Sequence, residues 1–197
     1  MVTSSTPVFI DCDNTMGMPR AEIDDGLTIL YLLSQSSVEI VGVSTTHGNA
    51  PVAATTRQTR ALLEALGSSL PVYPGRDAGT HRSGRPAPSE AATSEAAISL
   101  VEVSRRHEGR LVVLGLGALT NLADAASLDP EFFSRLAGIY LMGGYRAPLR
   151  FPRREFSELN LSSDPGAALF VLRAACPVTV TTAQLCLRAR FCRCGLI

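Results

Sequence analysis

Residues 8–33 read VFIDCDNTMGMPRAEIDDGLTILYLL, the most informative part of the chain. An apolar run typical of a buried strand ends at Asp11 and Asp13, and a helix is predicted to begin at Asp24, next to Asp25. Each pair has a simple explanation, because Asp is common in turns and an acidic pair can cap a helix and favour the positive end of its dipole. Four carboxylates at two neighbouring element ends nevertheless indicate a site.

Short apolar runs alternate with longer amphipathic ones along the rest of the chain. Strands are predicted at 7–13, 38–46, 71–75, 111–117, 137–144 and 177–185. Helices are predicted at 24–34, 52–66, 94–107, 119–128 and 164–175. The segment between the third strand and the third helix, residues 76–90, is rich in Gly, Pro and Arg and is expected to be an exposed loop. Apolar strands alternating with helices predict an α/β fold, a mainly parallel sheet with helices on both faces.

The composition excludes several classes of protein. The chain has 197 residues, 46% of them hydrophobic, which suits one globular domain with a substantial core. Its 18 basic and 18 acidic side chains balance, so neither nucleic acid nor an anionic membrane is expected as a partner. No apolar run reaches the roughly 18 residues of a membrane span. The odd number of cysteines, five, favours reduced thiols and a cytoplasmic location, and the pair Cys192 and Cys194 supplies only half of a zinc site.

Polar residues follow several of the predicted strands. In parallel sheets, ligands bind outside the carboxyl ends of the strands, so these segments are expected to converge on one rim. The segments concerned are Asp11 to Asp13, His47 to Asn49, Gly117 to Asn121 and Met142 to Gly144. Carboxylates that meet there would repel by about 4 kcal/mol per close pair at an effective dielectric constant of 20. The site must therefore bind protons or a cation, and clustered oxygen ligands favour Ca²⁺ or Mg²⁺.

Two families begin with such a segment. The run VFIDCDNT resembles the D-x-D-x-T motif of haloacid-dehalogenase-type phosphatases, in which Asp11 would be the nucleophile, Asp13 an acid or base, and Mg²⁺ the ion. In that family the second acidic pair normally comes late in the chain, whereas here it follows within a dozen positions. The resemblance to the second family covers nearly the whole chain.

That second resemblance is to the inosine–uridine-preferring nucleoside hydrolases, which begin with a D-x-D…DD signature. The signature corresponds here to DCDNTMGMPRAEIDDG, with a longer stretch between its acidic pairs than the commonest version. Further similar segments follow in the family's order: STTHGN at 44–49, LGALTNLA at 116–123, LMGG at 141–144, ELNLSSDPGAA at 158–168 and VTVTTAQ at 178–184. The resemblance implies a Rossmann-like nucleoside hydrolase fold and hydrolysis of the N-glycosidic bond of ribonucleosides to free base and ribose.

The resemblance also implies a calcium site. Asp13 and Asp25 would ligate Ca²⁺ through their side chains and Thr120 through its backbone carbonyl, while Asp11 would support the metal or its loop. Asp13 would take the proton of the bound water that attacks the ribose. The ribose hydroxyls would be bound by four further residues: Asp24, Asn49, Glu158 and Asn160. Members of the family usually form homo-oligomers.

The chain departs from the family's pattern in two places. Residues 145–157 lack a further Asn common in the family, and their arginines, within 146–154, are interpreted as a solvated loop, with a phosphate site as the alternative. The family's C-terminal region supplies a His near the leaving base and a last Asp ligand, whereas this chain ends in LRARFCRCGLI. None of His47, His81 and His107 is placed to fill that role.

We therefore expect a truncated member with the C-terminal part missing, for instance through a shifted reading frame after about Ala189. Residues 1–187 would form an incomplete nucleoside hydrolase-like domain and residues 188–197 an irregular tail. Activity is expected to be strongly impaired, and the alternative function is a non-catalytic ribose- or metal-binding module of the same fold.

Overall fold

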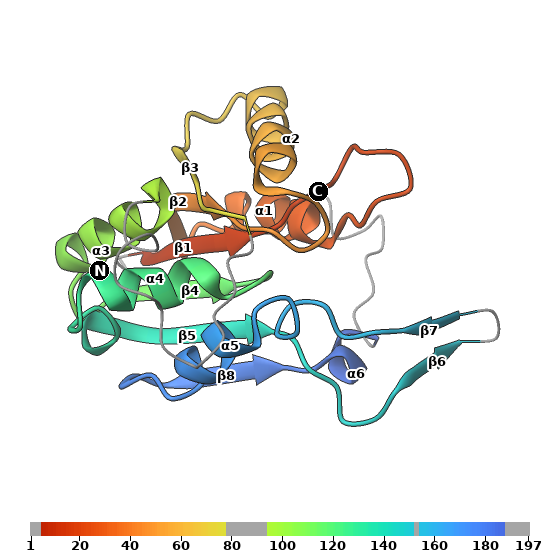
Figure 1. Ribbon diagram of the computed structural model, residues 1–197. Helices are drawn as coiled ribbons and strands as arrows, with labels where there is room; N and C mark the ends of the chain where they lie inside the picture. Colours follow the sequence, from red (N-terminus) through yellow and green to blue (C-terminus); the bar gives the residue numbers. More distant parts are fainter. Residues whose placement is uncertain (1–4, 78–93, 152–153, 188–197) are drawn as a thin grey trace.

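The computed structural model describes residues 5–77, 94–151 and 154–187 (Figure 1). Its centre is a six-stranded parallel sheet in the order β3-β2-β1-β4-β5-β8. These strands are β1 (Thr6–Cys12), β2 (Val38–Thr45), β3 (Val72–Pro74), β4 (Leu111–Gly115), β5 (Leu136–Met142) and β8 (Val178–Thr181). The helices are α1 (Asp24–Leu33), α2 (Val52–Ala65), α3 (Glu95–Arg106), α4 (Thr120–Leu128), α5 (Pro165–Val171) and α6 (Ala183–Cys186), with a 3₁₀ turn at Phe133–Arg135. The predicted α/β fold is confirmed.

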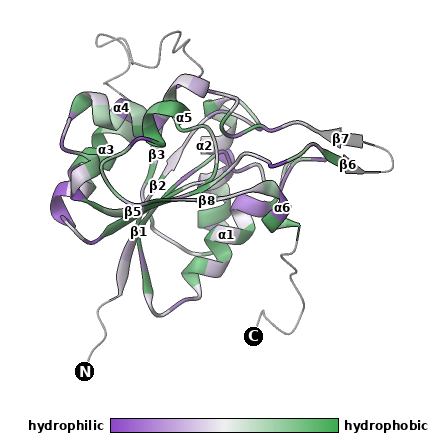
Figure 2. Ribbon diagram, turned by 90° about the horizontal axis from the view of Figure 1, so that it is seen from below, coloured by the Kyte–Doolittle hydropathy of each residue, from purple (hydrophilic) through white to green (hydrophobic). Residues whose placement is uncertain are grey.

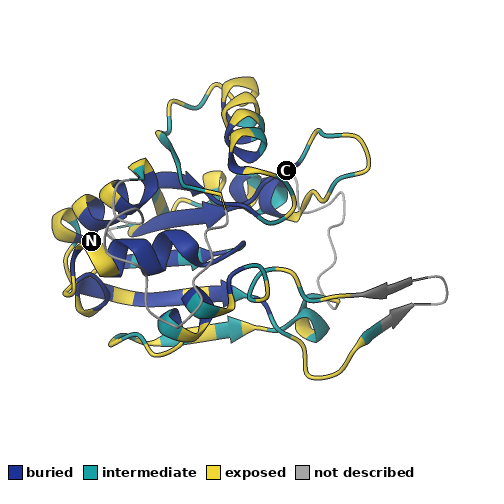
Figure 3. Cartoon of the chain, viewed as in Figure 1, coloured by how far each residue is buried: buried dark blue, intermediate teal, exposed yellow. Residues whose placement is uncertain are grey.

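Two hydrophobic clusters lie on opposite faces of the sheet. Because side chains alternate along a strand, β1 directs Phe9 into one cluster and Ile10 into the other. The first cluster includes residues of α3, α4 and α5, and the second includes Ile29 of α1 and Leu63 of α2. Figure 2 shows α3, α4 and α5 on the side of the sheet opposite to α1. Burial is greatest in β1, β4 and α4 (Figure 3). Tyr140 of β5, in contrast, is 51% exposed.

Local signals in the sequence explain where several helices begin and end. The Ser94 hydroxyl caps α3 by accepting a hydrogen bond from the Ala97 N–H (3.2 Å), and the Asp164 carboxylate caps α5 through the Ala167 N–H (3.1 Å). After α2, Gly67 takes a left-handed conformation with φ of +65°, which glycine adopts without steric cost.

Three predicted elements differ from the structure. The strand predicted at 177–185 ends at Thr181 and is followed by α6, because the loop after it turns back to bond Ala183 N–H to the Gly144 carbonyl. The helix predicted at 164–175 ends at Val171. The predicted loop at 145–157 contains an antiparallel hairpin, β6 (Leu149–Phe151) and β7 (Arg154–Phe156), which projects from the body (Figure 1). Most of the predicted loop at 76–90 lies outside the described residues.

The described helices include none that is long and apolar enough to cross a membrane.

The first cluster provides a direct test of the packing. Replacing fully buried Leu100 of α3 by Ala is expected to lower the free energy of unfolding by about 2–5 kcal/mol, because the cavity left in a close-packed core is only partly filled. The matched control is Ile98→Ala on the same helix, where the side chain is 41% exposed and the loss should be much smaller. Urea denaturation followed by circular dichroism measures both, and equal losses would contradict this packing.

Candidate functional site

Asp13 lies at the carboxyl end of β1, and its side chain is almost completely buried. Its Oδ2 accepts a hydrogen bond from the Asn49 N–H (2.5 Å), and its own N–H donates to Asp25 Oδ2 (3.0 Å). Its Oδ1 is buried without a hydrogen-bond partner among the described residues. The loops after β1 and β2 and the start of α1 therefore meet at this carboxylate, which has one oxygen left for a ligand.

Two glycines leave room for the Asp13 carboxylate. A Cβ at Gly48 would lie 2.2 Å from Asp13 Oδ2, and one at Gly117 would lie 3.0 Å from Oδ1 and 2.7 Å from a methyl group of Thr46. A side chain at Gly48 would require Asp13 to move, and one at Gly117 would require Thr46 to move and would press on Asp13. The glycines of the STTHGN and LGALTNLA segments thus help to define the site.

Gly48→Ala is expected to displace the Asp13 carboxylate and, if Asp13 ligates Ca²⁺ as proposed below, to weaken that binding by about 10–100-fold, the usual effect of disturbing a ligand's support. Calorimetric titration with CaCl₂ measures this. Gly109→Ala is the matched control, because Gly109 also has a positive φ (+71°) but a Cβ there would meet no atom within 4 Å. Equal Ca²⁺ affinity in the two variants would refute the role of Gly48.

Asp11 lies beneath Asp13 and is completely buried. Its Oδ1 accepts hydrogen bonds from Ser44 Oγ (2.5 Å) and Asn121 Nδ2 (2.7 Å), and the same Asn121 amide donates to the Thr45 carbonyl (3.1 Å). Asp11 therefore ties β1 to β2 and to α4. The sequence analysis placed Ser44 and Asn121 in segments that matter for the site, but it did not predict that both would bind Asp11.

Burial raises the pKa of all three buried carboxyl groups. The pKa of Asp11 rises to about 7, mainly by burial and partly offset by its hydrogen bonds from Asn121 and Ser44. The pKa of Asp13 rises to about 6, again mainly by burial, with the Asn49 N–H opposing the rise. Burial, followed by the charges of Asp13 and Asp24, raises the pKa of Asp25 well above its ordinary value. Among the described residues, none of these three acids forms an ion pair with a basic side chain.

The donor set at this point fits a hard divalent cation in part. Asp13 and Asp25 are adjacent, and the unpartnered Oδ1 of Asp13 and Oδ2 of Asp11 are acceptors of the kind that such ions satisfy. In the described ranges, no group of three or more His, Cys, Asp and Glu side chains is arranged to hold a metal. The side chains described would thus fill only part of a coordination shell, which backbone carbonyls, water or a ligand's hydroxyls would complete.

A cavity of about 570 Å³ opens beside these acids. It lies between the loops that follow β1, β2, β4 and β5 and the start of α6, and its volume suits a small organic ligand. The lining includes both Asp24 and Asp25 and the three other residues expected to bind ribose: Asn49, Glu158 and Asn160. Asp24 and Asn49 are exposed at its edge. Sequence segments more than 130 residues apart therefore share one cavity.

Glu158 and Asn160 fix the cavity wall through backbone groups. Glu158 accepts hydrogen bonds from three backbone N–H groups, those of Gly144 (3.1 Å), Leu161 (2.9 Å) and Ser162 (2.7 Å). The amide of Asn160 donates to the carbonyls of Leu116 (2.7 Å) and Met142 (3.0 Å). Both side chains therefore hold the surrounding loops in place. A carboxylate has about four acceptor positions, so Glu158 keeps one for a ligand.

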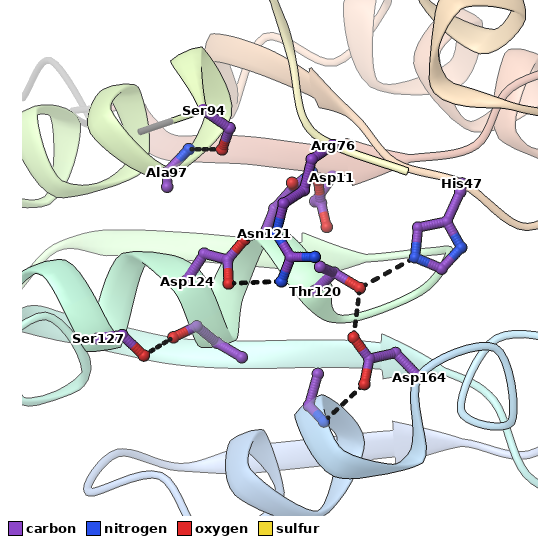
Figure 4. Close-up of polar contacts among 12 residues, drawn as sticks. Asp11, His47, Arg76, Ser94, Ala97, Thr120, Asn121, Asp124, Ser127 and Asp164 are labelled. Carbon is purple, nitrogen blue, oxygen red and sulfur yellow. Dashed lines mark hydrogen bonds and ion pairs between the residues drawn. The ribbon is translucent and has the colours of Figure 1, made fainter. Parts of the chain in front are cut away.

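Thr120 is the first residue of α4 and is completely buried. Its hydroxyl donates to Asp164 Oδ2 (2.7 Å) and lies 3.1 Å from His47 Nε2 (Figure 4). Nearby, Arg76 forms a two-pronged ion pair with buried Asp124 of α4 (2.7 and 3.0 Å). The sequence analysis did not anticipate the contacts of His47, Asp164 or Arg76.

Other residues noted in the sequence lie away from the acids or outside the described ranges. Arg146 precedes the hairpin and its N–H donates to Gln184 Oε1 (3.0 Å), while the side chains of 150–156 are not described. His107 follows α3. The described cysteines, Cys12, Cys176 and Cys186, are free thiols. His81, Cys192, Cys194 and the expected tail at 188–197 lie outside the described residues.

Comparison with known proteins decides the family. The sequence model described as "Inosine-uridine preferring nucleoside hydrolase" matches residues 8–194. The chain belongs to this family. The resemblance recognised from the sequence segments is thereby confirmed.

Relatives and solved structures agree with this assignment. A probable uridine nucleosidase of Arabidopsis thaliana is 31% identical over 166 residues, which are 74% of this chain and 51% of that protein. The uridine nucleosidase of Saccharomyces cerevisiae is 29% identical over 195 residues, 88% of this chain and 55% of that protein. The structure of a purine-preferring ribonucleoside hydrolase from Gardnerella vaginalis matches with a TM-score of 0.72 at 25% identity, over 89% of this chain and 60% of that one. The chain spans about half the length of the curated relatives it matches.

Proposed function

We propose that this chain carries the ribose- and metal-binding part of a ribonucleoside hydrolase, and that it hydrolyses the N-glycosidic bond to release free base and ribose, at the impaired rate expected from its sequence. The observation that carries the proposal is that Asp24, Asp25, Asn49, Glu158 and Asn160 line one and the same cavity. These carboxylate and amide groups suit a vicinal diol, and the unpartnered Oδ1 of Asp13 lies at the same edge of the sheet. Family membership favours a nucleoside as the ligand.

The residues that would hold a divalent cation are Asp13 and Asp25, with Asp11 supporting them and the backbone carbonyl of Thr120 as a further ligand. We propose Ca²⁺, because its flexible oxygen shell accommodates carboxylates and sugar hydroxyls together. A bound cation would supply positive charge that makes a neighbouring water more acidic. Without a cation, the raised pKa values of Asp11, Asp13 and Asp25 mean that these groups hold protons more readily than ordinary carboxyl groups.

In the reaction, Asp13 accepts the proton of the attacking water, since its Oδ2 is held by the Asn49 N–H while Oδ1 is left for the water. Asp24, Asn49, Glu158 and Asn160 orient the ribose through its hydroxyls. As the bond to the base breaks, positive charge develops on the sugar ring, and the acidic lining of the cavity stabilises it. Each of these roles is assigned by similarity to the family and by position.

The test is release of free base from uridine and from inosine, measured by chromatography with and without EDTA. Release that EDTA abolishes and Ca²⁺ restores is the expected result. Binding of ribose or Ca²⁺ without release would support the alternative of a non-catalytic binding module. Release of phosphate from a generic monoester would instead support the phosphatase interpretation of the D-x-D-x-T motif.

The two nucleosides also report base preference, because relatives include both uridine nucleosidases and a purine-preferring enzyme. The cytoplasmic location rests on the use of cysteine, and the homo-oligomer on similarity to the family. Both stay predictions. Size-exclusion chromatography with light scattering tests the second.

A further inference from the structure

Three side chains from distant parts of the sequence form a continuous chain of hydrogen bonds beside the cavity. His47 Nε2 lies 3.1 Å from Thr120 Oγ1, and Thr120 Oγ1 donates to Asp164 Oδ2 at 2.7 Å (Figure 4). The other oxygen of Asp164 accepts the Ala167 N–H and so caps α5. His47, Thr120 and Asp164 are 7%, 0% and 4% exposed, so water competes little for these bonds.

The directions of these bonds fix the proton on His47. A threonine hydroxyl has one hydrogen, and that of Thr120 is directed to Asp164. The bond between His47 and Thr120 must then be donated by His47, which places a hydrogen on Nε2. Both hydrogen bonds are thus donated in the same direction: His47 donates to Thr120, and Thr120 donates to Asp164.

These hydrogen bonds link three segments on which the site depends. His47 precedes Gly48 and Asn49, whose backbone packs against and bonds to Asp13 Oδ2. Thr120 begins α4, and the next residue holds Asp11 through its side-chain amide. Asp164 joins these loops to α5, which follows directly after the segment that carries Glu158 and Asn160.

We propose that His47 is a positioning residue: as an Nε2–H donor to Thr120, it holds the loop after β2 against the starts of α4 and α5 and thereby sets the placement of Asp13. The proposal rests on the proposed function for its catalytic readout. His47 itself does not make the hydrogen bond to Asp13 Oδ2, because the backbone N–H of Asn49, two residues further along, makes it. Its loss should therefore disturb the geometry of the site without removing any ligand.

The test compares four variants of this hydrogen-bond chain and one control variant with the unaltered protein. His47→Phe keeps a ring of similar size and removes the donor, whereas His47→Gln restores a donor. Thr120→Val removes the hydroxyl at nearly constant volume, and the double variant removes both partners. His107→Phe is the matched control, since His107 follows α3 and is only partly buried. Each is measured for kcat and KM with uridine and inosine, for Ca²⁺ affinity by calorimetry and for thermal stability.

We expect His47→Phe to lower kcat/KM and Ca²⁺ affinity by about 10–100-fold, with the main loss in kcat rather than KM. His47→Gln should recover most of that loss, and His107→Phe should match the unaltered chain. If the two residues act through one chain, the double variant should lose little more than either single variant. Full activity of His47→Phe, or losses in the double variant that add, would overturn the proposal.

A spectroscopic measurement separates this proposal from the proposed function. Proton–nitrogen correlation spectra of the ¹⁵N-labelled imidazoles, with His47 assigned by its loss in His47→Gln, should show a slowly exchanging hydrogen on Nε2. A neutral ring with its hydrogen on Nδ1 alone would overturn the proposal whatever the activity. A chain with the expected spectrum that neither binds Ca²⁺ nor releases base would overturn the proposed function, and with it the positioning role, while leaving the hydrogen-bond chain in place.

Discussion

Asp13→Asn is expected to lower kcat/KM for uridine and inosine by about 10²–10⁴-fold, the usual contribution of a general base. Asparagine has nearly the shape of aspartate, so its oxygen can still accept the Asn49 N–H while its NH₂ group occupies the place of the unpartnered Oδ1. The substitution therefore removes the proposed proton acceptor and one proposed anionic ligand while keeping the loop in place. Base release with saturating Ca²⁺ measures the loss.

The control is Glu102→Gln, which also removes one negative charge but on an exposed position of α3. Its kcat/KM should equal that of the unaltered chain. A second measurement guards against misfolding: thermal stability of Asp13→Asn in EDTA should equal or exceed that of the unaltered chain, because one of the crowded buried carboxylates is gone. Near-normal turnover by a folded Asp13→Asn would refute the assignment of the base.

In EDTA, the free energy of unfolding is expected to fall by several kcal/mol as pH rises from about 4 to 8. The pKa of Asp11 is raised from 3.8 to about 7 and that of Asp13 to about 6, chiefly by burial. Between these values and 3.8 the folded chain binds more protons than the unfolded chain, so raising the pH favours unfolding. The shift at Asp11 alone corresponds to about 4 kcal/mol. Urea titrations at stepped pH values measure the slope.

Two comparisons make this result specific. Asp11→Asn should remove the part of the dependence that Asp11 contributes and leave the part of Asp13 and Asp25, and its amide oxygen can still accept from Ser44 and Asn121. Saturating Ca²⁺ at pH 8 should restore stability, since a cation replaces the protons. Asp129 has the opposite effect. Hydrogen bonds from Glu131 N–H, Arg105 and Arg135 outweigh burial and lower the pKa of Asp129. The stability that this carboxylate gives to the fold is therefore lost only as pH falls below about 4. Stability that rises with pH from 5 to 8 in EDTA would contradict the buried acidic cluster.

The elements of the sheet and most helix ends could be predicted because their causes are local. Apolar runs such as residues 111–117 mark strands buried on both faces, and Ser94, Asp164 and Gly67 act within one helical turn of their own positions. The hairpin of β6 and β7 was missed because each strand has only three residues, too few for a periodic pattern to show. The end of β8 was missed because a contact with Gly144, in another loop, decides it.

The sequence by itself determined the fold class and which loops carry the acids, because in a parallel sheet every loop after a strand must reach the same edge. The tertiary structure alone decided the partners within the site. Asn121 holds Asp11 from 110 positions away, and His47 meets Thr120 from 73 positions away. Such pairs depend on β1 lying beside β4 and on how α4 and α5 pack, and no periodicity in the chain encodes that order.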